Sequence, residues 1–238
     1  MSLEVKDVFA GYYADINILQ GVSVSAEKGR ITIVIGANGV GKSTLFKVIY
    51  GFLKPHSGKI IYNDEEITGT NPYTISKKGI SYIPQRRNIF PYLSVEENWE
   101  MGAWIFRKDK KRMKQRIKAN YERFPTLGSK RKTDAGSLSG GEQRMVEIGR
   151  ALMVDPDLIL VDEPTAGLAP VVAKEIYSKL KQLNRVENKT ILLVDQNIRQ
   201  AMKIADYIYI LELGKNKTQG SKAAFETDLK AMIKDWLF

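Results

Sequence analysis

The chain has 238 residues, of which 43% are hydrophobic, enough to fill the core of one large domain or two small ones. It contains no cysteine and a single histidine, His56, which excludes disulfides, thiolate metal sites and His-rich metal sites. No stretch reaches the roughly 18 consecutive apolar residues of a membrane helix, and residues 1–9 carry charges where a secretion signal is apolar. We therefore expect a soluble, cytoplasmic protein.

Short apolar runs predict strands along the chain. Residues 4–9 and 21–25 alternate apolar and polar side chains, as half-buried strands do. Continuous apolar runs, typical of parallel strands covered by helices on both faces, lie at residues 31–35, 158–161, 191–194 and 207–211. Helical patterns separate them, such as Val172, Ile176, Leu180 and Leu183 after Pro170, a residue suited to a first helical turn. The sequence therefore predicts an α/β fold.

A glycine-rich segment follows the apolar run at residues 31–35. It reads Gly36, Ala37, Asn38, Gly39, Val40, Gly41, Lys42 and Ser43, followed by Thr44 and a helical pattern. This matches the phosphate-binding pattern G-x-x-x-x-G-K-[ST] between a strand and a helix. Backbone N–H groups and the helix dipole favour phosphate, Lys42 supplies positive charge for the β- and γ-phosphates, and the Ser43 hydroxyl is a ligand for Mg²⁺.

The apolar β runs stop between about residues 93 and 132, where a helical insertion is predicted. Ser94 and Glu97 have the S-x-x-E spacing of a capping box, and a charged, helix-favouring segment follows. Residues 107–118 hold eight basic residues and one acid, Asp109, a net charge of +7. This run is interpreted either as a solvated helix face or as a surface near anionic lipid. Because aromatic residues are not interleaved in it, nucleic acid is not expected as a partner.

A second glycine-containing helix start lies at residues 138–142, Leu-Ser-Gly-Gly-Glu. Ser139 and Glu142 again have the capping-box spacing, and Gly140 and Gly141 leave N–H groups accessible. The helical pattern continues through Met145, Ile148 and Leu152. By itself this segment is a well-capped helix. A second anion-binding helix start would have a function if it bound the nucleotide that is held by another copy of the chain.

The apolar run at residues 158–161 ends in two adjacent carboxylates, Asp162 and Glu163. The end of a parallel strand can deliver both to the crevice that also holds a phosphate loop. There Asp162 is a ligand for Mg²⁺, directly or through water, and Glu163 can polarise an attacking water. Together with the phosphate loop, the pair predicts nucleotide hydrolysis.

These motifs, with LSGGE followed by QRMVEIGRAL, resemble the motifs of ABC ATPases in the order that family uses, over nearly the whole chain. The resemblance implies one ABC ATPase domain over residues 1–238. It would have a P-loop NTPase core with a mainly parallel sheet, an N-terminal antiparallel β subdomain and a helical subdomain at about residues 93–150. It also implies a head-to-tail dimer with an identical or similar ATPase subunit. In that dimer Ser139, Gly140, Gly141 and Glu142 of one subunit close over ATP held by the other.

The same resemblance assigns further nucleotide contacts. Tyr12 resembles the aromatic residue that stacks on adenine. Tyr13, its neighbour, is an alternative for that role, and the simpler alternative is that Tyr12 is an aromatic residue of the core. Gln85, after Tyr-Ile-Pro, resembles the glutamine that senses Mg²⁺. Gln196 stands where many relatives have a histidine that contacts the γ-phosphate; it can donate a hydrogen bond but cannot take up a proton. Ala169 replaces the aspartate that communicates across the dimer.

The segments GANGVGKST, SLSGGEQRMVEIGRALM, DEPTAGLAP and DQN resemble the ATPases of branched-chain amino acid importers. This implies an ATPase on the inner face of the cell membrane that drives uptake of a small solute through transmembrane permease subunits. Two alternatives stay open, the ATPase of a lipid or lipopolysaccharide exporter and a soluble ABC ATPase outside transport.

Overall fold

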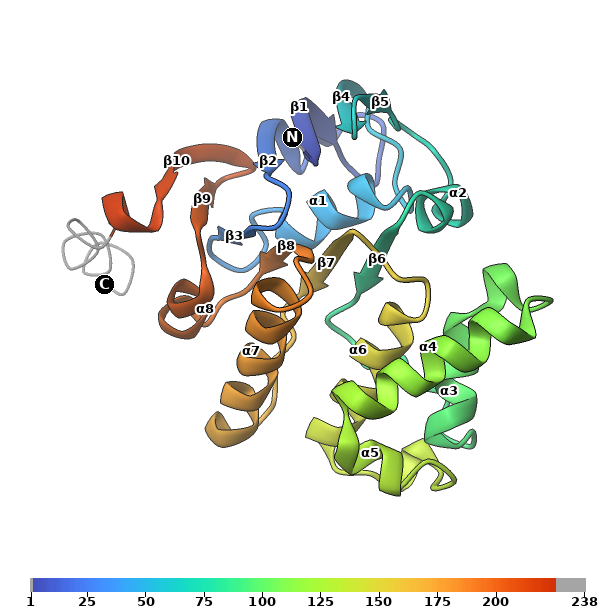
Figure 1. Ribbon diagram of the computed structural model, residues 1–238. Coiled ribbons are helices and arrows are strands. Elements are labelled where there is room, and N and C mark those ends of the chain that lie inside the picture. Colours follow the sequence, from blue (N-terminus) through green and yellow to red (C-terminus); the bar gives the residue numbers. More distant parts are fainter. Residues whose placement is uncertain (1, 226–238) are drawn as a thin grey trace. The chain divides into compact units, whose positions relative to one another are not determined.

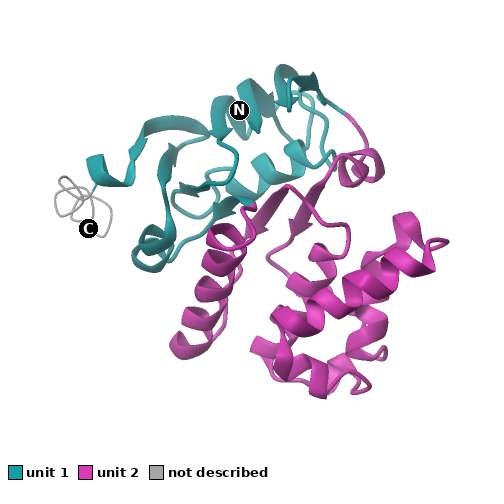
Figure 2. Ribbon diagram, in the orientation of Figure 1, with its two compact units in different colours: residues 1–69, 190–238 teal, residues 70–189 magenta. Residues whose placement is uncertain are grey.

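The computed structural model describes residues 2–225, which divide into two compact units (Figure 2). Residues up to 69 and from 190 onward form the first unit, and residues 70–189 form the second. The single ABC ATPase domain over residues 1–238, with its helical subdomain near 93–150, stays a prediction. Within the described residues, no helix is both long and apolar enough to cross a membrane.

The first unit contains an antiparallel sheet with the strand order β2-β1-β4-β5 (Figure 1). Its strands are β1 (Leu3–Ala10), β2 (Leu19–Ala26), β4 (Ser57–Tyr62) and β5 (Glu65–Glu66). Buried and more accessible side chains alternate along much of β1 and β2, as the sequence predicts for half-buried strands. The alternation in β1 is interrupted at Asp7, whose φ of 47° accompanies a shift of register between Val5 and Val8.

The same unit contains four further strands in the order β10-β9-β3-β8. These are β3 (Ile31–Ile35), β8 (Thr190–Val194), β9 (Tyr207–Glu212) and β10 (Lys215–Ser221). Strand β3 pairs in parallel with β8 and with β9, whereas β10 pairs antiparallel with β9. Every residue of β3 and β8 is buried, as expected for strands covered on both faces. The helices of this unit include α1 (Lys42–Ile49) and α8 (Ile198–Ile204).

The second unit is mainly helical. Its strands β6 (Ile80–Ile83) and β7 (Leu158–Asp162) pair in parallel. Its helices are α2 (Pro72–Lys77), α3 (Val95–Gly102), α4 (Lys110–Arg123), α5 (Pro125–Ser129), α6 (Gly140–Leu152) and α7 (Pro170–Arg185), with short 3₁₀ turns η1 (Trp104–Phe106) and η2 (Ala135–Ser137). The parallel strands, the helices and the separate antiparallel sheet confirm the predicted α/β fold.

Helices α3 and α6 pack closely around Trp99, which is fully buried. The Trp99 indole N–H donates a hydrogen bond of 3.2 Å to the Val146 carbonyl. A Cβ at position 149 would lie 2.4 Å from Trp99 Nε1, so the contact requires Gly149. Helix α3 begins at a capping box of Ser94 and Glu97, which confirms the helix start predicted there.

Candidate functional site

The predicted phosphate-binding loop connects β3 to α1 in the first unit, as its sequence context indicates. Gly41 precedes α1 with a φ of 102°, a conformation that favours glycine, and a Cβ there would lie 2.6 Å from Leu19 Cδ2. No side-chain hydrogen bond caps the start of α1 within the described structure. Lys42, Ser43 and Thr44 form the first turn of α1, at the positive end of the helix dipole, where anions are favoured.

Lys42 is buried, and its ammonium group is held by the loop itself. Its Nζ donates hydrogen bonds of 2.8 Å to the Gly36 carbonyl and 2.9 Å to the Ala37 carbonyl. These bonds compensate the burial of a cation and fix its charge at the start of α1. Asn38 and Gly39 form the exposed outer part of the loop. The arrangement places a full positive charge beside an anion-binding helix end.

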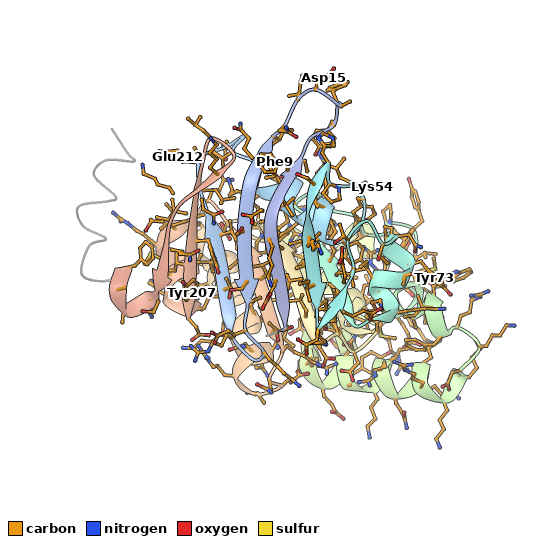
Figure 3. All side chains as sticks on the ribbon, turned by 90° about the horizontal axis from the view of Figure 1, so that it is seen from above. Phe9, Asp15, Lys54, Tyr73, Tyr207 and Glu212 are labelled. Atoms are coloured by element: carbon orange, nitrogen blue, oxygen red, sulfur yellow. The ribbon has the colours of Figure 1, made fainter. Side chains whose placement is uncertain are left out.

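Tyr12 lies in the loop between β1 and β2, which projects outward with Asp15 at its tip (Figure 3). Its side chain is 51% exposed, so the alternative of an aromatic core position is wrong; Tyr13, at 73%, is more exposed still. Lys47 of α1 donates a 2.8 Å hydrogen bond to the Tyr12 hydroxyl, and its Nζ lies 5.0 Å from the Tyr12 ring centroid. This contact holds Tyr12 against α1, the helix that follows the phosphate loop.

Gln196 lies in the turn between β8 and α8 and is exposed. The residues on either side of it hold the turn. Buried Asp195 accepts a 2.8 Å hydrogen bond from the Asn197 N–H, and the Asn197 side chain accepts from the Gln200 N–H at the start of α8. The turn is therefore organised by Asp195 and Asn197, while Gln196 carries its amide at the surface.

The adjacent carboxylates Asp162 and Glu163 lie at the end of β7 in the second unit, and both are buried. The Tyr82 hydroxyl donates a 3.1 Å hydrogen bond to Asp162 Oδ2. The Gln85 side-chain amide donates a 2.7 Å hydrogen bond to Glu163 Oε2, so the structure brings these two predicted site residues together. Glu163 has a φ of 41°, a backbone conformation that costs a residue with a side chain about 1–3 kcal/mol. Such strain is typical of functional positions.

Arg144 is a residue of this region that the sequence did not single out. It is buried on α6, and its guanidinium donates hydrogen bonds to the carbonyls of Pro84 at 2.8 Å, Gln85 at 3.0 Å and Pro164 at 2.9 Å. It also forms a 2.7 Å ion pair with buried Glu147. Because one planar cation bonds both segments, it fixes the backbone beside Gln85 and the backbone beside Glu163. The sequence signal that could have revealed Arg144 is that it and Glu147, a basic and an acidic residue, lie among the apolar positions of one helix.

The predicted helix start at Ser139 is confirmed by a capping box at the beginning of α6. The Ser139 hydroxyl donates to Glu142 Oε2 at 2.8 Å, and Lys130 donates to Glu142 Oε1 at 2.5 Å. The bond from Lys130, followed by those from the Ser139 N–H and hydroxyl, holds the pKa of Glu142 below its ordinary value of 4.5. Glu142 therefore organises the helix start as a carboxylate.

The two glycines of this helix start are closely packed. A Cβ at Gly140 would lie 2.5 Å from Arg87 Nη2, and one at Gly141 would lie 2.4 Å from Val172 Cγ1. A cavity of about 250 Å³ lies beside them, with Phe124 and Met145 in its lining. The predicted helix through Met145, Ile148 and Leu152 is confirmed; Ile148 and Leu152 are buried and Met145 is half-buried. The buried face of α6 also includes the polar side chains Gln143, Arg144 and Glu147.

The described residues contain no cluster of three or more His, Asp or Glu side chains that could hold a metal ion. Mg²⁺ usually takes one or two carboxylates together with water and substrate phosphates. The predicted Mg²⁺ ligands are Ser43 of the first unit and Gln85 and Asp162 of the second, and their role as ligands stays a prediction.

Comparisons with known proteins agree with these motifs. The family model described as "ABC transporter" matches residues 19–166. The high-affinity branched-chain amino acid transport ATP-binding protein BraG of Pseudomonas aeruginosa is 43% identical over 94% of this chain and 95% of its own. The probable branched-chain amino acid transport ATP-binding protein LivF of Archaeoglobus fulgidus is 41% identical over 88% of each chain.

The fold leads to the same family. The crystal structure of a nucleotide-free ATP-binding cassette from an ABC transporter matches with a TM-score of 0.85 and 30% identity, and covers 96% of this chain and 95% of that one. The sequence relatives and the structural neighbour are therefore the same kind of protein, and each matches this chain over most of its length. The chain belongs to the ABC transporter family and is one of its ATP-binding ATPases.

Proposed function

We propose that the chain is the ATP-hydrolysing subunit of an importer for branched-chain amino acids. The observation that supports nucleotide binding is the position of Lys42, whose charge is held beside the start of α1 by the Gly36 and Ala37 carbonyls. In this proposal the N–H groups of residues 36–44 bind the β- and γ-phosphates of ATP, and Lys42 neutralises their charge. The loop residues that contribute are Gly36, Asn38, Gly39, Gly41, Lys42, Ser43 and Thr44.

Ser43, Gln85 and Asp162 are proposed to hold Mg²⁺, which would supply positive charge to the β- and γ-phosphate oxygens. Their hydroxyl, amide and carboxylate oxygens are hard donors, and the burial of Asp162 favours pairing with a cation. Gln85 is the link between the metal and the water-activating group, because its amide nitrogen already donates to Glu163. One side chain can thereby contact both groups.

Glu163 is the proposed group that orients and deprotonates the attacking water. It has one oxygen fixed by Gln85, and its backbone is held in an uncommon conformation at the end of β7. Gln196, which is exposed in the turn before α8, is proposed to donate a hydrogen bond to the γ-phosphate. Tyr12, exposed and braced by Lys47, is proposed to stack on adenine.

The start of α6 is proposed to bind the γ-phosphate of a second subunit. Ser139 with Gly140 and Gly141 form a helix end with small side chains, and Glu142 fixes its geometry from within. The partners are then an identical or similar ATPase subunit in a head-to-tail dimer and transmembrane permease subunits. The assembly would place this chain on the cytoplasmic face of the cell membrane.

A mixing experiment tests the composite site. Ser139→Arg should leave ATP affinity of a single chain intact, because Lys42 and its loop are unchanged, yet it should prevent dimer closure. In a mixed dimer with Lys42→Ala, both lesions fall in one site and the other site is intact. Hydrolysis that returns on mixing supports the proposal. ATP affinity falling in step with activity in Ser139→Arg alone would place this helix start beside the chain's own nucleotide and contradict it.

The solute is tested by transport. The chain should co-purify with hydrophobic permease subunits, and proteoliposomes containing both should take up labelled leucine only when supplied with ATP. Glu163→Gln in the same complex is the matched control, since it should assemble but not transport. A complex that hydrolyses ATP without accumulating leucine, isoleucine or valine would contradict the solute assignment and leave the ATPase assignment in place.

A further inference from the structure

The second unit carries a continuous basic surface at the start of α4. We define it by the exposed residues Arg107, Lys108, Lys110, Lys111, Lys114 and Lys118. Lys111, Lys114 and Lys118 are three and four positions apart and so lie on one side of α4. The opposite side is buried through Met113 and Ile117. Long side chains that end in nitrogen project outward from the pale green helix of this segment (Figure 3).

Within residues 2–225, carboxylates do not neutralise the basic surface. The one acid in the run, Asp109, accepts a 2.9 Å hydrogen bond from the Arg112 N–H and caps α4. Asp155 pairs with Arg116, which lies closer to the buried side of α4 and outside the basic surface. In the part of the chain that the structure describes, no ion pair joins a residue of the basic surface to a carboxylate. Lysines this close repel one another, so an anionic partner stabilises their arrangement.

Aromatic side chains lie directly before this surface. Trp104 in η1 is 55% exposed, and the Arg107 guanidinium lies 4.8 Å from its ring centroid. In the same way, the Arg112 guanidinium lies 4.3 Å from the ring centroid of Phe106. Because their own chain's guanidinium groups already occupy faces of these rings, the rings are poor platforms for nucleic-acid bases. An exposed indole beside lysines is instead typical of a protein surface at the headgroup level of a bilayer.

We infer that the basic surface binds the anionic headgroups of a lipid bilayer, with Trp104 at the level of the headgroups. The lysine ammonium groups pair with lipid phosphates, and α4 lies along the bilayer surface without entering it. The inference goes beyond the proposed function, because it concerns contact with lipid rather than with a permease. It does not depend on which solute is moved.

Binding of the purified full-length chain to vesicles tests this inference. Vesicles of phosphatidylcholine with phosphatidylglycerol should retain the chain, and vesicles of phosphatidylcholine alone should not. The triple variant Lys111→Gln, Lys114→Gln, Lys118→Gln should bind the anionic vesicles on the order of 100-fold more weakly, since each charge contributes about fivefold. The control Lys77→Gln, Lys181→Gln, Lys203→Gln removes the same charge from exposed positions of other helices and should bind as the unchanged chain does.

A fluorescence measurement tests the place of Trp104. Anionic vesicles should shift the tryptophan emission to shorter wavelength, and Trp104→Phe should remove that shift. Equal vesicle binding by the two triple variants would overturn the inference, because net charge alone would then explain it. Retention of the chain on duplex DNA or RNA but not on anionic vesicles would also overturn it. ATP hydrolysis in solution should be the same in the unchanged chain and both triple variants, which shows that the variants are folded.

Discussion

The side-chain amide of Gln85 donates a 2.7 Å hydrogen bond to Glu163 Oε2, and both residues belong to the second unit. The bond joins the residue proposed to sense Mg²⁺ to the residue proposed to activate water. In the proposed mechanism the carboxylate of Glu163 acts on a water molecule. Substitutions in this pair are therefore the most direct way to test nucleotide binding and hydrolysis separately.

Glu163→Gln should retain ATP binding and slow hydrolysis about 100- to 10,000-fold, the usual contribution of a general base. The fold should tolerate the change, because a glutamine carbonyl can still accept the hydrogen bond from Gln85. The measurement is phosphate release at saturating ATP, with affinity measured in parallel by calorimetry. With hydrolysis blocked, ATP should also produce a monomer-to-dimer shift in light scattering. An unchanged hydrolysis rate would assign water activation to another residue.

Lys42→Ala should lose most ATP affinity, because it removes the ammonium group that the Gly36 and Ala37 carbonyls hold at the phosphate loop. Lys54→Ala is the matched control, since it removes an exposed lysine of the same unit and should not alter binding. Calorimetry measures both. Near-normal affinity in Lys42→Ala would count decisively against the phosphate-loop assignment.

Gln196→His should support hydrolysis, because an imidazole N–H can replace the amide as a hydrogen-bond donor. Gln196→Ala should impair hydrolysis with little effect on folding, since the turn is held by Asp195 and Asn197. Phosphate release at saturating ATP compares the three chains. Equal rates for glutamine, histidine and alanine would show that the position takes no part in the reaction.

Arg144→Ala should lower the free energy of unfolding by about 3–5 kcal/mol, because it leaves Glu147 buried without its partner and three carbonyls without a donor. Arg116→Ala is the control: its ion pair with Asp155 is partly exposed and should contribute no more than about 1 kcal/mol. Urea unfolding at neutral pH compares them. Equal losses in the two variants would mean that Arg144 does not stabilise this region as its contacts indicate.

The contribution of Asp155 to stability should depend on pH. Burial raises the pKa of this carboxyl, but hydrogen bonds and charge from Lys189 and Arg116 outweigh burial and lower it below its ordinary value of 3.8. A lowered pKa in the folded state means that the unfolded chain takes up a proton first as the pH falls. The stabilisation is therefore complete above about pH 4 and is lost as the pH falls through the lower, folded-state pKa.

Asp155→Asn provides the comparison, because asparagine tolerates the φ of 56° at this position. Its free energy of unfolding should lie about 1 kcal/mol below that of the unchanged chain at pH 7, a modest figure because the pair is partly exposed. The difference should shrink below pH 4. A difference that stays constant down to pH 3 would contradict the assigned ion pairs.

Local patterns were enough to predict the parts of the site that depend on neighbouring residues. The loop at residues 36–43 and the helix starts at Ser94 and Ser139 each follow from spacing within a few positions, and the structure has them where predicted. Arg144 could not be found in this way. Its carbonyl partners are 60 positions away at Pro84 and 20 positions away at Pro164, and only the folded chain brings them together.

The helix predicted from Met145, Ile148 and Leu152 is confirmed as part of α6, but the helical pattern does not show which polar residues of the helix are buried. Met145, Ile148 and Leu152 have helical spacing, but Met145 is half-buried beside a cavity while Glu147 is buried. A charged residue inside the core requires a partner whose position hydropathy does not reveal. For Tyr12 only the alternative of a core strand position is wrong: β1 ends at Ala10, so the residue lies on a projecting loop and not on a strand.

The single guanidinium of Arg144 also has a consequence for timing in a reaction cycle. It is carried by the first turns of α6, the helix that begins at Ser139, and it bonds the backbone next to Gln85 and next to Glu163. If the nucleotide of a second subunit docks at Ser139, as proposed, a movement of α6 would act on both segments at once through this one planar group. Arrival of the opposite subunit and alignment of the water-activating carboxylate would then be one event rather than two.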